Sequence, residues 1–132
     1  MLETMNLRSS KRIEMIDITA QVNEIISKSG IASGICVINV PHTTSAITVN
    51  ENADIDTTYD IIDKTSRLVP HDDSYAHIEG NSDAHIKTSL FGQSITLIVH
   101  DSRLLMGTWQ SLFFCEFDGP RARKIFIKII KD

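Results

Sequence analysis

Three histidines stand among polar side chains that favour one shared site: His42 in the segment 41–45, and His77 and His85 in the segment 75–85. Imidazole nitrogens ligate divalent metals well, and three such ligands leave a coordination position open for water or substrate. A loop followed by a helix start can bring His77 and His85 together, although this spacing is less specific than HExxH. We predict that the three histidines bind a metal, with structural, hydrogen-bonded roles as the alternative.

Three carboxylates are candidates for catalytic or supporting roles. Glu51 and Asp54 follow the first histidine segment, and Glu116 ends an apolar run that starts at Leu112. A carboxylate at these places can act as a general base, orient a metal-bound histidine, or bind Mg²⁺ through water. Asp54 can equally cap a helix. A carboxylate buried at the end of an apolar run needs a partner or a raised pKa, which makes Glu116 the most informative of the three.

Residues suited to binding a substrate lie in the last polar segment. Arg121 and Arg123 carry planar guanidinium groups that match phosphate or carboxylate, and their alternative role is a salt bridge to Glu116 or Asp118. Trp109 can stack a planar ring, or it can be an ordinary core residue.

The predicted elements place these residues at strand ends and in loops, where functional groups are usually presented. Periodicity and capping residues predict helices over 19–29, from Asp54 through Ile62, and from Asn81 or Ser82 through Leu90, with a long loop over 67–81. The predicted strands cover 5–16, 35–40, 46–49, 94–100, 109–117 and 124–130. Strands and helices do not alternate regularly, so we expect an α+β fold whose mainly antiparallel sheet curls into a barrel or sandwich. With no repeat and no linker, residues 1–132 form one domain.

Bulk composition excludes several classes of protein. The formal net charge of −4 argues against a nucleic-acid partner, although the cationic residues near position 121 and beyond form either a solvated strand edge or a phosphate-binding patch. No apolar stretch approaches the length of a membrane span, and the first residues do not resemble a signal peptide. Cys36 and Cys115 stand in apolar runs and are expected to be buried thiols. We therefore predict a cytoplasmic protein that binds neither nucleic acid nor membrane.

Three segments resemble the YjbQ-like family of secondary thiamine-phosphate synthases. They are PHTTSAITVNENAD (41–54), HIEGNSDAHIKTSLFGQS (77–94) and MGTWQSLFFCEFDGPRAR (106–123). Each is weak alone, but three long motifs in order are specific, and the resemblance covers essentially the whole chain. The chain departs from the family pattern at Met106 and at Asp101-Ser102, and neither departure removes a candidate site residue.

The resemblance implies a barrel-like α+β fold and a homotrimer with pockets shared between subunits. It also implies a weak transferase that couples a pyrimidine diphosphate to a thiazole phosphate and releases pyrophosphate, so the expected partner is a phosphorylated small molecule. In this hypothesis the histidines hold Zn²⁺ or Mg²⁺, Arg121 and Arg123 meet phosphate, and Trp109 stacks the pyrimidine. The motif residues carried over as site candidates are His42, His77, His85, Asn81, Trp109, Gln110, Glu116 and Arg121.

Two other functions fit the same residues. Mg²⁺, the usual partner of diphosphate, prefers oxygen ligands, whereas three histidines prefer Zn²⁺. That mismatch argues against thiamine-phosphate synthesis as the main activity. The second enzyme hypothesis is a metal-dependent hydrolase or lyase with an activated metal-bound water. The other alternative is a non-catalytic trimeric binding protein, in which the histidines are interface or core groups satisfied by hydrogen bonds.

Overall fold

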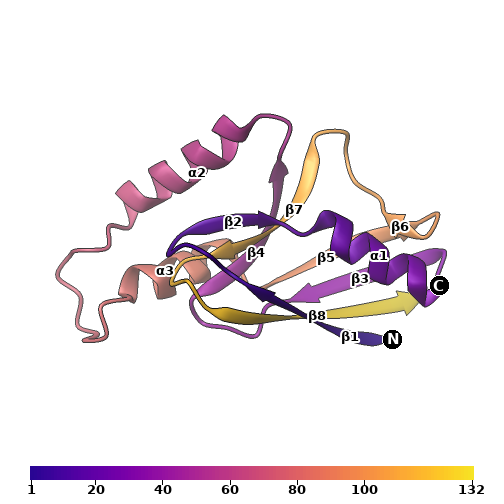
Figure 1. The fold of residues 1–132 in the computed structure, drawn as a ribbon, viewed down its shortest axis with the longest axis horizontal. Coiled ribbons are helices and arrows are strands. Elements are labelled where there is room, and N and C mark those ends of the chain that lie inside the picture. Colours follow the sequence, from indigo (N-terminus) through magenta and orange to yellow (C-terminus); the bar gives the residue numbers. More distant parts are fainter.

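Two antiparallel sheets and three helices make up the structure, a computed structural model that describes residues 1–132 (Figure 1). The larger sheet has the strand order β1-β8-β3-β5-β6, and the smaller has the order β2-β7-β4. The strands are β1 (Leu2–Arg8), β2 (Glu14–Asp17), β3 (Ser33–Asn39), β4 (Ser45–Glu51), β5 (Ser94–His100), β6 (Arg103–Leu104), β7 (Gln110–Glu116) and β8 (Ala122–Lys131). The helices are α1 (Thr19–Ser29), α2 (Ile55–Leu68) and α3 (Ser82–Phe91). The prediction of an α+β fold with a curled, antiparallel sheet is confirmed.

The main core lies between the larger sheet, α1 and one face of the smaller sheet. Strand β8 contributes alternate side chains to it, Ile125, Ile127 and Ile129, while Lys124 and Lys128 on the other face of the strand stay exposed. This is the period-2 pattern expected of a strand with one buried face. Helix α1 adds Val22 and Ile26 and ends, as its sequence predicts, at a left-handed Gly30 with φ of 74°. The residues that fill this core are Ile18, Val22, Ile26, Cys36, Ile38, Val40, Ile47, Val99, Leu104, Leu112, Phe114, Ile125, Ile127 and Ile129.

A second, smaller core lies on the opposite face of the smaller sheet, under α3. Strand β7 contributes to both cores because successive side chains of a strand point to opposite faces. Leu112 and Phe114 belong to the main core, and Phe113 and Cys115 belong to the smaller one. Both faces of β7 are therefore buried. This explains why its sequence is a continuous apolar run rather than an alternating one.

The predicted strand over 5–16 is wrong as a single element. It is two strands, β1 and β2, which belong to different sheets. The chain crosses between the sheets at Ser9, whose N–H donates to the carbonyl of Arg121 at 3.0 Å and whose side chain is buried. A hydrogen-bond partner so distant in sequence leaves no trace in local periodicity.

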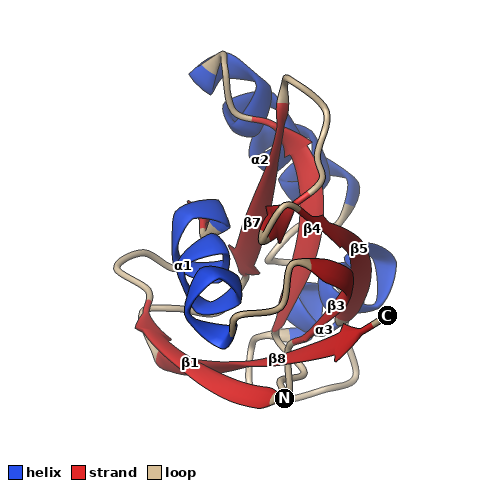
Figure 2. Cartoon of the chain, turned by 90° about the vertical axis from the view of Figure 1, so that its right-hand side faces the viewer, coloured by secondary structure: helices blue, strands red, loops and turns tan.

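Helix α2 differs from the rest of the fold, because none of its side chains is buried. Ile55, Tyr59 and Leu68 are 79%, 66% and 68% exposed. The helix stands apart from the sheets in Figure 1, and in Figure 2 it passes behind β7 and β4 with one end extending beyond them. Its other isoleucines, Ile61 and Ile62, are half-buried, so this chain covers the apolar residues of α2 only in part. None of the helices combines the length and the apolarity needed to cross a membrane.

Candidate functional site

The three polar sequence segments meet in a cavity of about 340 Å³, which we call the His42 cavity. None of its lining residues is hydrophobic. Of the predicted site residues it contains His42, Asn81, His85, Arg121 and Arg123. The full lining is Pro41, His42, Thr43, Thr44, Glu79, Asn81, His85, Asp118, Arg121 and Arg123. The loop between β3 and β4, the start of α3, and the turn before β8 each supply part of it.

His42 is fixed by a backbone hydrogen bond. Its Nε2 accepts the N–H of Lys124 at 3.0 Å. Burial and the nearby charge of Arg123 lower the pKa of His42 below its usual value, so the ring is neutral at pH 7. Because Nε2 uses its lone pair as an acceptor, the proton of the neutral ring resides on Nδ1. His42 therefore acts in this site as a hydrogen-bond donor.

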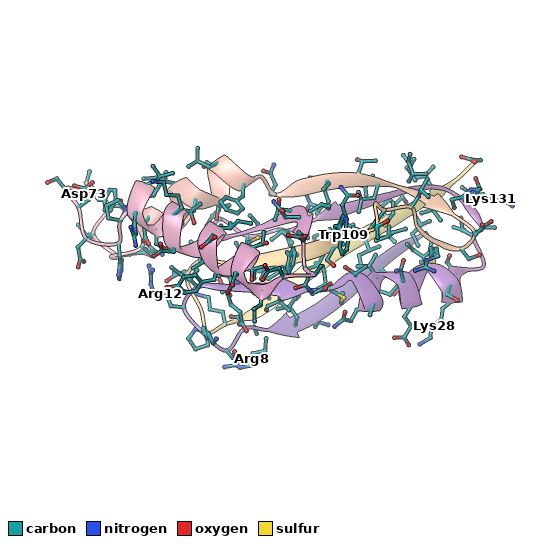
Figure 3. The ribbon with its side chains drawn as sticks, turned by 90° about the horizontal axis from the view of Figure 1, so that it is seen from above. Arg8, Arg12, Lys28, Asp73, Trp109 and Lys131 are labelled. Atoms are coloured by element: carbon teal, nitrogen blue, oxygen red, sulfur yellow. The ribbon has the colours of Figure 1, made fainter.

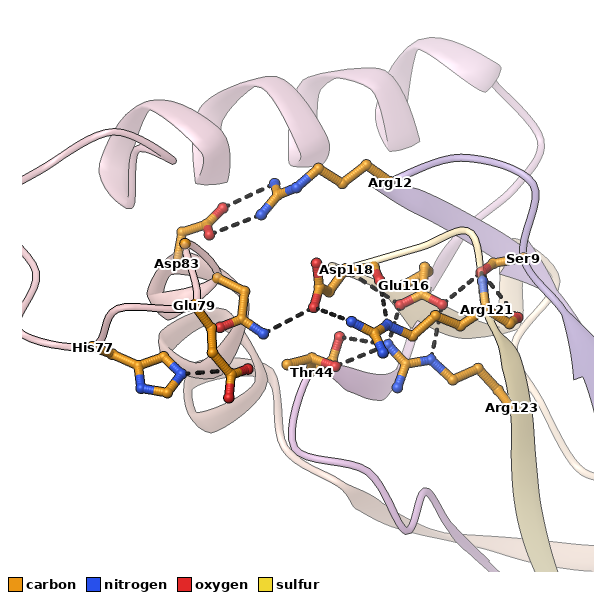
Figure 4. Close-up of polar contacts among 12 residues, drawn as sticks. Ser9, Arg12, Thr44, His77, Glu79, Asp83, Glu116, Asp118, Arg121 and Arg123 are labelled. Atoms are coloured by element: carbon orange, nitrogen blue, oxygen red, sulfur yellow. Dashed lines mark hydrogen bonds and ion pairs between the residues drawn. The ribbon is translucent and has the colours of Figure 1, made fainter.

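Glu116 and Arg123 form a buried ion pair behind the cavity (Figure 4). Arg123 Nε donates to Glu116 Oε1 at 2.9 Å, and Arg123 Nη2 donates to Thr44 Oγ1 at 2.9 Å. The carboxylate also accepts from Ser9 Oγ at 2.6 Å and from the N–H of Asp118 at 3.1 Å. Burial by itself raises the pKa of a carboxyl, but the hydrogen bonds from Arg123 and Ser9 outweigh it and lower the pKa of Glu116.

This pair settles an alternative that the sequence leaves open. Glu116 is fully buried, lines no part of the cavity, and serves to hold Arg123. The predicted catalytic role of Glu116 therefore has no geometric support in this chain, and the salt-bridge alternative for Arg123 is confirmed.

Asp118 joins two further predicted residues. Its Oδ2 accepts from Asn81 Nδ2 at 2.9 Å and from Arg121 Nη2 at 2.8 Å. Asn81 occupies the N-cap position of α3, yet its side chain makes no capping bond. Its Oδ1 is buried without any partner in the chain. A buried acceptor without a donor is costly, so Asn81 is placed for a role other than capping.

His77 and His85 contact each other beside a neighbouring cavity of about 360 Å³. Their ring centroids are 5.3 Å apart with an edge-to-face angle of 87°, and His77 Nε2 lies 3.7 Å from Glu79 Oε2. His85 lines both cavities, whereas His42 lines one and His77 the other. The chain contains no group of three or more His, Cys, Asp or Glu side chains placed to hold a metal ion. The three-histidine metal site stays a prediction.

Two predicted catalytic residues lie away from the His42 cavity, at the far end of β4. Glu51 accepts a hydrogen bond from Thr57 Oγ1 at 2.8 Å. The Asp54 side chain accepts the N–H of Asp56 at 2.9 Å and so caps α2, which confirms the alternative role for Asp54. A single chain therefore does not bring Glu51 or Asp54 to the histidines.

Two predicted substrate-binding residues are also separate from the His42 cavity. Trp109 is 64% exposed and is not a core residue; it stands near the middle of the molecule's long axis, away from the loop at Asp73 (Figure 3). The Gln110 side chain accepts the N–H of Gly107 at 2.8 Å and lines a different cavity.

Several residues of the site carry no sequence signal that identifies them. Ser9 sits in an ordinary polar stretch, but its hydroxyl connects Glu116 with the backbone of Arg121. Arg12 and Asp83 form a bidentate pair, at 3.1 and 3.0 Å, that connects the crossing between the sheets to α3 (Figure 4). Only the fold brings these residues together.

The sequence of this chain is similar to proteins of one family. A family model described as UPF0047 protein YjbQ-like matches residues 3–132. The chain is 52% identical to a UPF0047 protein of Methanocaldococcus jannaschii, over 100% of this chain and 96% of the relative. It is 46% identical to the UPF0047 protein YugU of Bacillus subtilis, over 98% and 99% of the two chains.

Solved structures agree with this match. A conserved YjbQ/UPF0047 protein from Clostridium acetobutylicum is 47% identical, covers 97% of this chain and 99% of its own, and superposes with a TM-score of 0.94. A protein from Sulfolobus solfataricus, described as YbjQ-like and of unknown function, is 35% identical with a TM-score of 0.95, over 100% and 97% of the two chains.

These comparisons correct the predicted activity. The relatives carry the UPF0047 name and no name of a thiamine-phosphate synthase, and UPF0047 is a family distinct from that enzyme. The prediction of a thiamine-phosphate synthase-type transferase is therefore wrong. The motifs identified the relatives correctly, but the activity attached to the resemblance does not follow from them.

Proposed function

This chain belongs to the YjbQ-like UPF0047 family, and we propose that its His42 cavity binds a small metabolite through a phosphate or carboxylate group. The observation that supports this most strongly is the lining of the cavity, which is entirely without hydrophobic residues and combines two arginines with two histidines. Small-molecule pockets are usually mostly apolar. A polar lining of this kind suits a ligand that is itself polar and charged.

The donors of the cavity suit an anionic group. The guanidinium of Arg121 is about half exposed, and Nη1 has no partner, while Nε and Nη2 are held by Asp118 at 2.7 and 2.8 Å. This leaves one side of a rigid, planar fork available to a ligand oxygen. The neutral ring of His42 presents Nδ1–H as a second donor. Asp118 and Glu116 balance the two arginines, and Glu79 also lines the cavity. Directed hydrogen bonds rather than a net positive charge therefore select the ligand.

A test of this function measures binding of inorganic phosphate, pyrophosphate and citrate to the intact protein by titration calorimetry. Arg121→Gln removes a charge-assisted donor that is worth about 1.5–3 kcal/mol, so at least one of the three anions should bind more than tenfold weaker. Lys28→Gln, on an exposed face of α1 where Lys28 pairs only with Glu24, is the matched control and should bind as the parent does. Absence of binding by all three anions, or equal affinity in the Arg121→Gln protein, contradicts the proposal.

The contact between His77 and His85 favours a second candidate, a metal-dependent hydrolase or lyase. Two imidazoles with Glu79 beside them are ligand types that suit Zn²⁺. Since one chain does not place three such ligands together, a metal needs either a rearranged Glu79 or a ligand from a second copy. Metal analysis of untagged protein tests this candidate: Zn²⁺ that is lost in His85→Ala supports it, and equal metal content in the two proteins contradicts it.

The homotrimer implied by the resemblance belongs to the same proposal. Its support is the exposed apolar surface of Trp109 and of Tyr59 on α2, which a second copy can cover. Such an arrangement offers a way for Trp109, remote from His42 within one chain, to approach the cavity of a neighbour. Sedimentation analysis measures the assembly state, and Trp109→Ala should weaken it. The cytoplasmic location expected from the sequence stays a prediction.

A further inference from the structure

A second cavity, of about 400 Å³, lies at the opposite end of the larger sheet. We call it the Arg103 cavity. Strand β5 connects the two regions: Ser94 at its start pairs with Asn39, near His42, and His100 at its end lines the second cavity. In Figure 1, α3 and β6 mark these two ends. The lining consists of Thr19, Asn23, His100, Asp101, Arg103, Leu104, Leu105, Met106, Gly107, Thr108 and Gln110, and it shares no residue with the His42 cavity.

Two side-chain amides of this cavity are oriented by the backbone. Asn23 Oδ1 accepts the N–H of Leu104 at 2.8 Å, and Gln110 Oε1 accepts the N–H of Gly107 at 2.8 Å. A backbone N–H can only donate, so the oxygen of each amide must face it. The NH₂ groups of both amides are thereby left without a partner in the chain. The cavity therefore has amide donors available and amide acceptors already used.

The cationic residue of the cavity, Arg103, is not neutralised by an ion pair. Arg103 takes part in no ion pair and no side-chain hydrogen bond. The one acidic lining residue, Asp101, is 85% exposed and lies 3.5 Å from His100 Nε2 rather than beside Arg103. An unpaired guanidinium beside two free amide NH₂ groups favours an oxygen-rich anion.

The rest of the lining adds an apolar wall and a rigid frame. Leu104, Leu105 and Met106 are its hydrophobic members. His100 and Arg103 are paired across a two-residue turn in which Asp101 and Ser102 both have positive φ, 50° and 59°. Non-glycine residues in this region are strained, which is tolerated where the surrounding structure holds them. The N–H of Ser102 donates to the carbonyl of Ala32 at 3.1 Å and anchors the turn.

From this arrangement we propose that the Arg103 cavity is a second ligand site, separate from the His42 cavity, for an organic anion with a short apolar portion. The anionic head, a carboxylate or a phosphate ester, meets Arg103 and the amides of Asn23 and Gln110. The apolar portion contacts the wall formed by Leu104–Met106. The site is independent of the proposed function of the His42 cavity.

The test uses butyrate and butyl phosphate as probes, in calorimetry and in amide NMR of the intact protein. We expect one or both probes to bind and to shift the backbone signals of Leu104 and Gly107. Asn23→Asp is the decisive variant, because its carboxylate still accepts the N–H of Leu104 but replaces the donor by a negative charge. It should weaken binding by at least tenfold. Gln21→Glu, which adds the same charge on an exposed position of the same helix, should leave affinity unchanged.

Two further variants test whether the Arg103 cavity is a separate anion site. Arg103→Gln should weaken binding as Asn23→Asp does, and Arg121→Gln in the His42 cavity should not affect it. If neither probe binds, or if Asn23→Asp binds as well as or better than the parent, the anion site is refuted. If Arg121→Gln abolishes binding together with Arg103→Gln, the two cavities are one site, and the separate site is refuted while the proposed function of the His42 cavity stands.

Discussion

The two ends of this molecule use arginine in opposite ways. Around the His42 cavity, Arg123 and Arg121 are each paired with a carboxylate close by in sequence, Glu116 and Asp118. Hydrogen bonds then connect these pairs to Thr44 and Asn81, which are distant in sequence. At the other end, Arg103 has no partner. A paired arginine contributes to the architecture of its site before any ligand arrives. An unpaired arginine contributes little to stability and keeps its full charge for a ligand. Substitutions around the His42 cavity should therefore reduce stability, whereas substitution of Arg103 should reduce ligand binding and leave stability nearly unchanged.

The largest effect should come from breaking the buried pair. Glu116→Leu leaves the guanidinium of Arg123, which is 5% exposed, without a counter-charge, and such a break costs about 3–5 kcal/mol of unfolding free energy. Arg103→Gln, at the open end, should change stability by less than about 0.5 kcal/mol. Urea unfolding measures both. The double variant Glu116→Leu/Arg123→Met should recover part of the loss; equal small effects at the two ends would remove the distinction.

The same pair should make the protein sensitive to acid. The pKa of Glu116 is lowered in the folded state from its ordinary 4.5, so its stabilising contribution is complete above that value and is lost as the pH falls through the folded pKa. Each unit of difference between the folded and unfolded pKa corresponds to about 1.4 kcal/mol. Unfolding free energy measured from pH 6 to pH 3 should decline less steeply in Glu116→Gln.

Asp83 gives a check on that experiment, because it titrates in the same direction. Burial opposes ionisation of Asp83, but Arg12 outweighs it and lowers its pKa. Asp83→Asn should therefore remove a further part of the acid dependence. A parent protein whose stability does not change between pH 6 and pH 3 contradicts the assignment of both carboxylates.

A smaller effect should distinguish the two functions of Asn23. Its oxygen holds the N–H of Leu104, whereas its NH₂ group is free. Asn23→Leu leaves that N–H unsatisfied and should cost about 1–3 kcal/mol of unfolding free energy. Asn23→Asp retains the acceptor and should cost clearly less in urea unfolding at pH 7. Equal losses in the two variants would show that the hydrogen bond to Leu104 does not orient the amide.

The smallest global effect should come from α2. Asp54→Ala removes the cap of this helix, which is worth about 1 kcal/mol to the helix itself. Because α2 buries no side chain in this chain, global unfolding of the monomer should change by less than about 0.5 kcal/mol. Hydrogen exchange should accelerate within Ile55–Leu68 and stay unchanged in β7. Accelerated exchange in β7 contradicts this independence of α2 from the cores.

The sequence predicted the parts of the fold that depend on local pattern. The boundaries of α1 and the inward face of β8 follow from periodicity and capping residues. That His42, Asn81 and Arg121 share a site was implied by the family resemblance, and all three line one cavity. The roles of individual side chains did not follow, because their partners are distant. Ser9 and Glu116 are 107 positions apart, and His42 and Lys124 are 82 apart.

Local sequence pattern also could not predict which apolar side chains are exposed. The apolar positions of α2 predicted an amphipathic helix correctly, but periodicity cannot tell whether the same chain supplies a surface to cover its apolar face. Trp109 presents the same difficulty, since its exposure depends on where the loop before β7 lies. An apolar face that is exposed in the single chain and one that is buried within it have the same sequence pattern.

The strand order of the larger sheet has a consequence for synthesis on the ribosome. Strand β8 lies between β1 and β3, yet it is the last strand in chain order, and its pairing with β1 joins Leu2 to Lys128. The main core therefore cannot close until residues 122–131 have emerged. Topologies dominated by such distant pairings fold slowly, typically in milliseconds to seconds. Until then the apolar faces of α1, β1 and β3 are exposed, so a nascent chain of this protein should be a substrate for chaperones until its final strand appears.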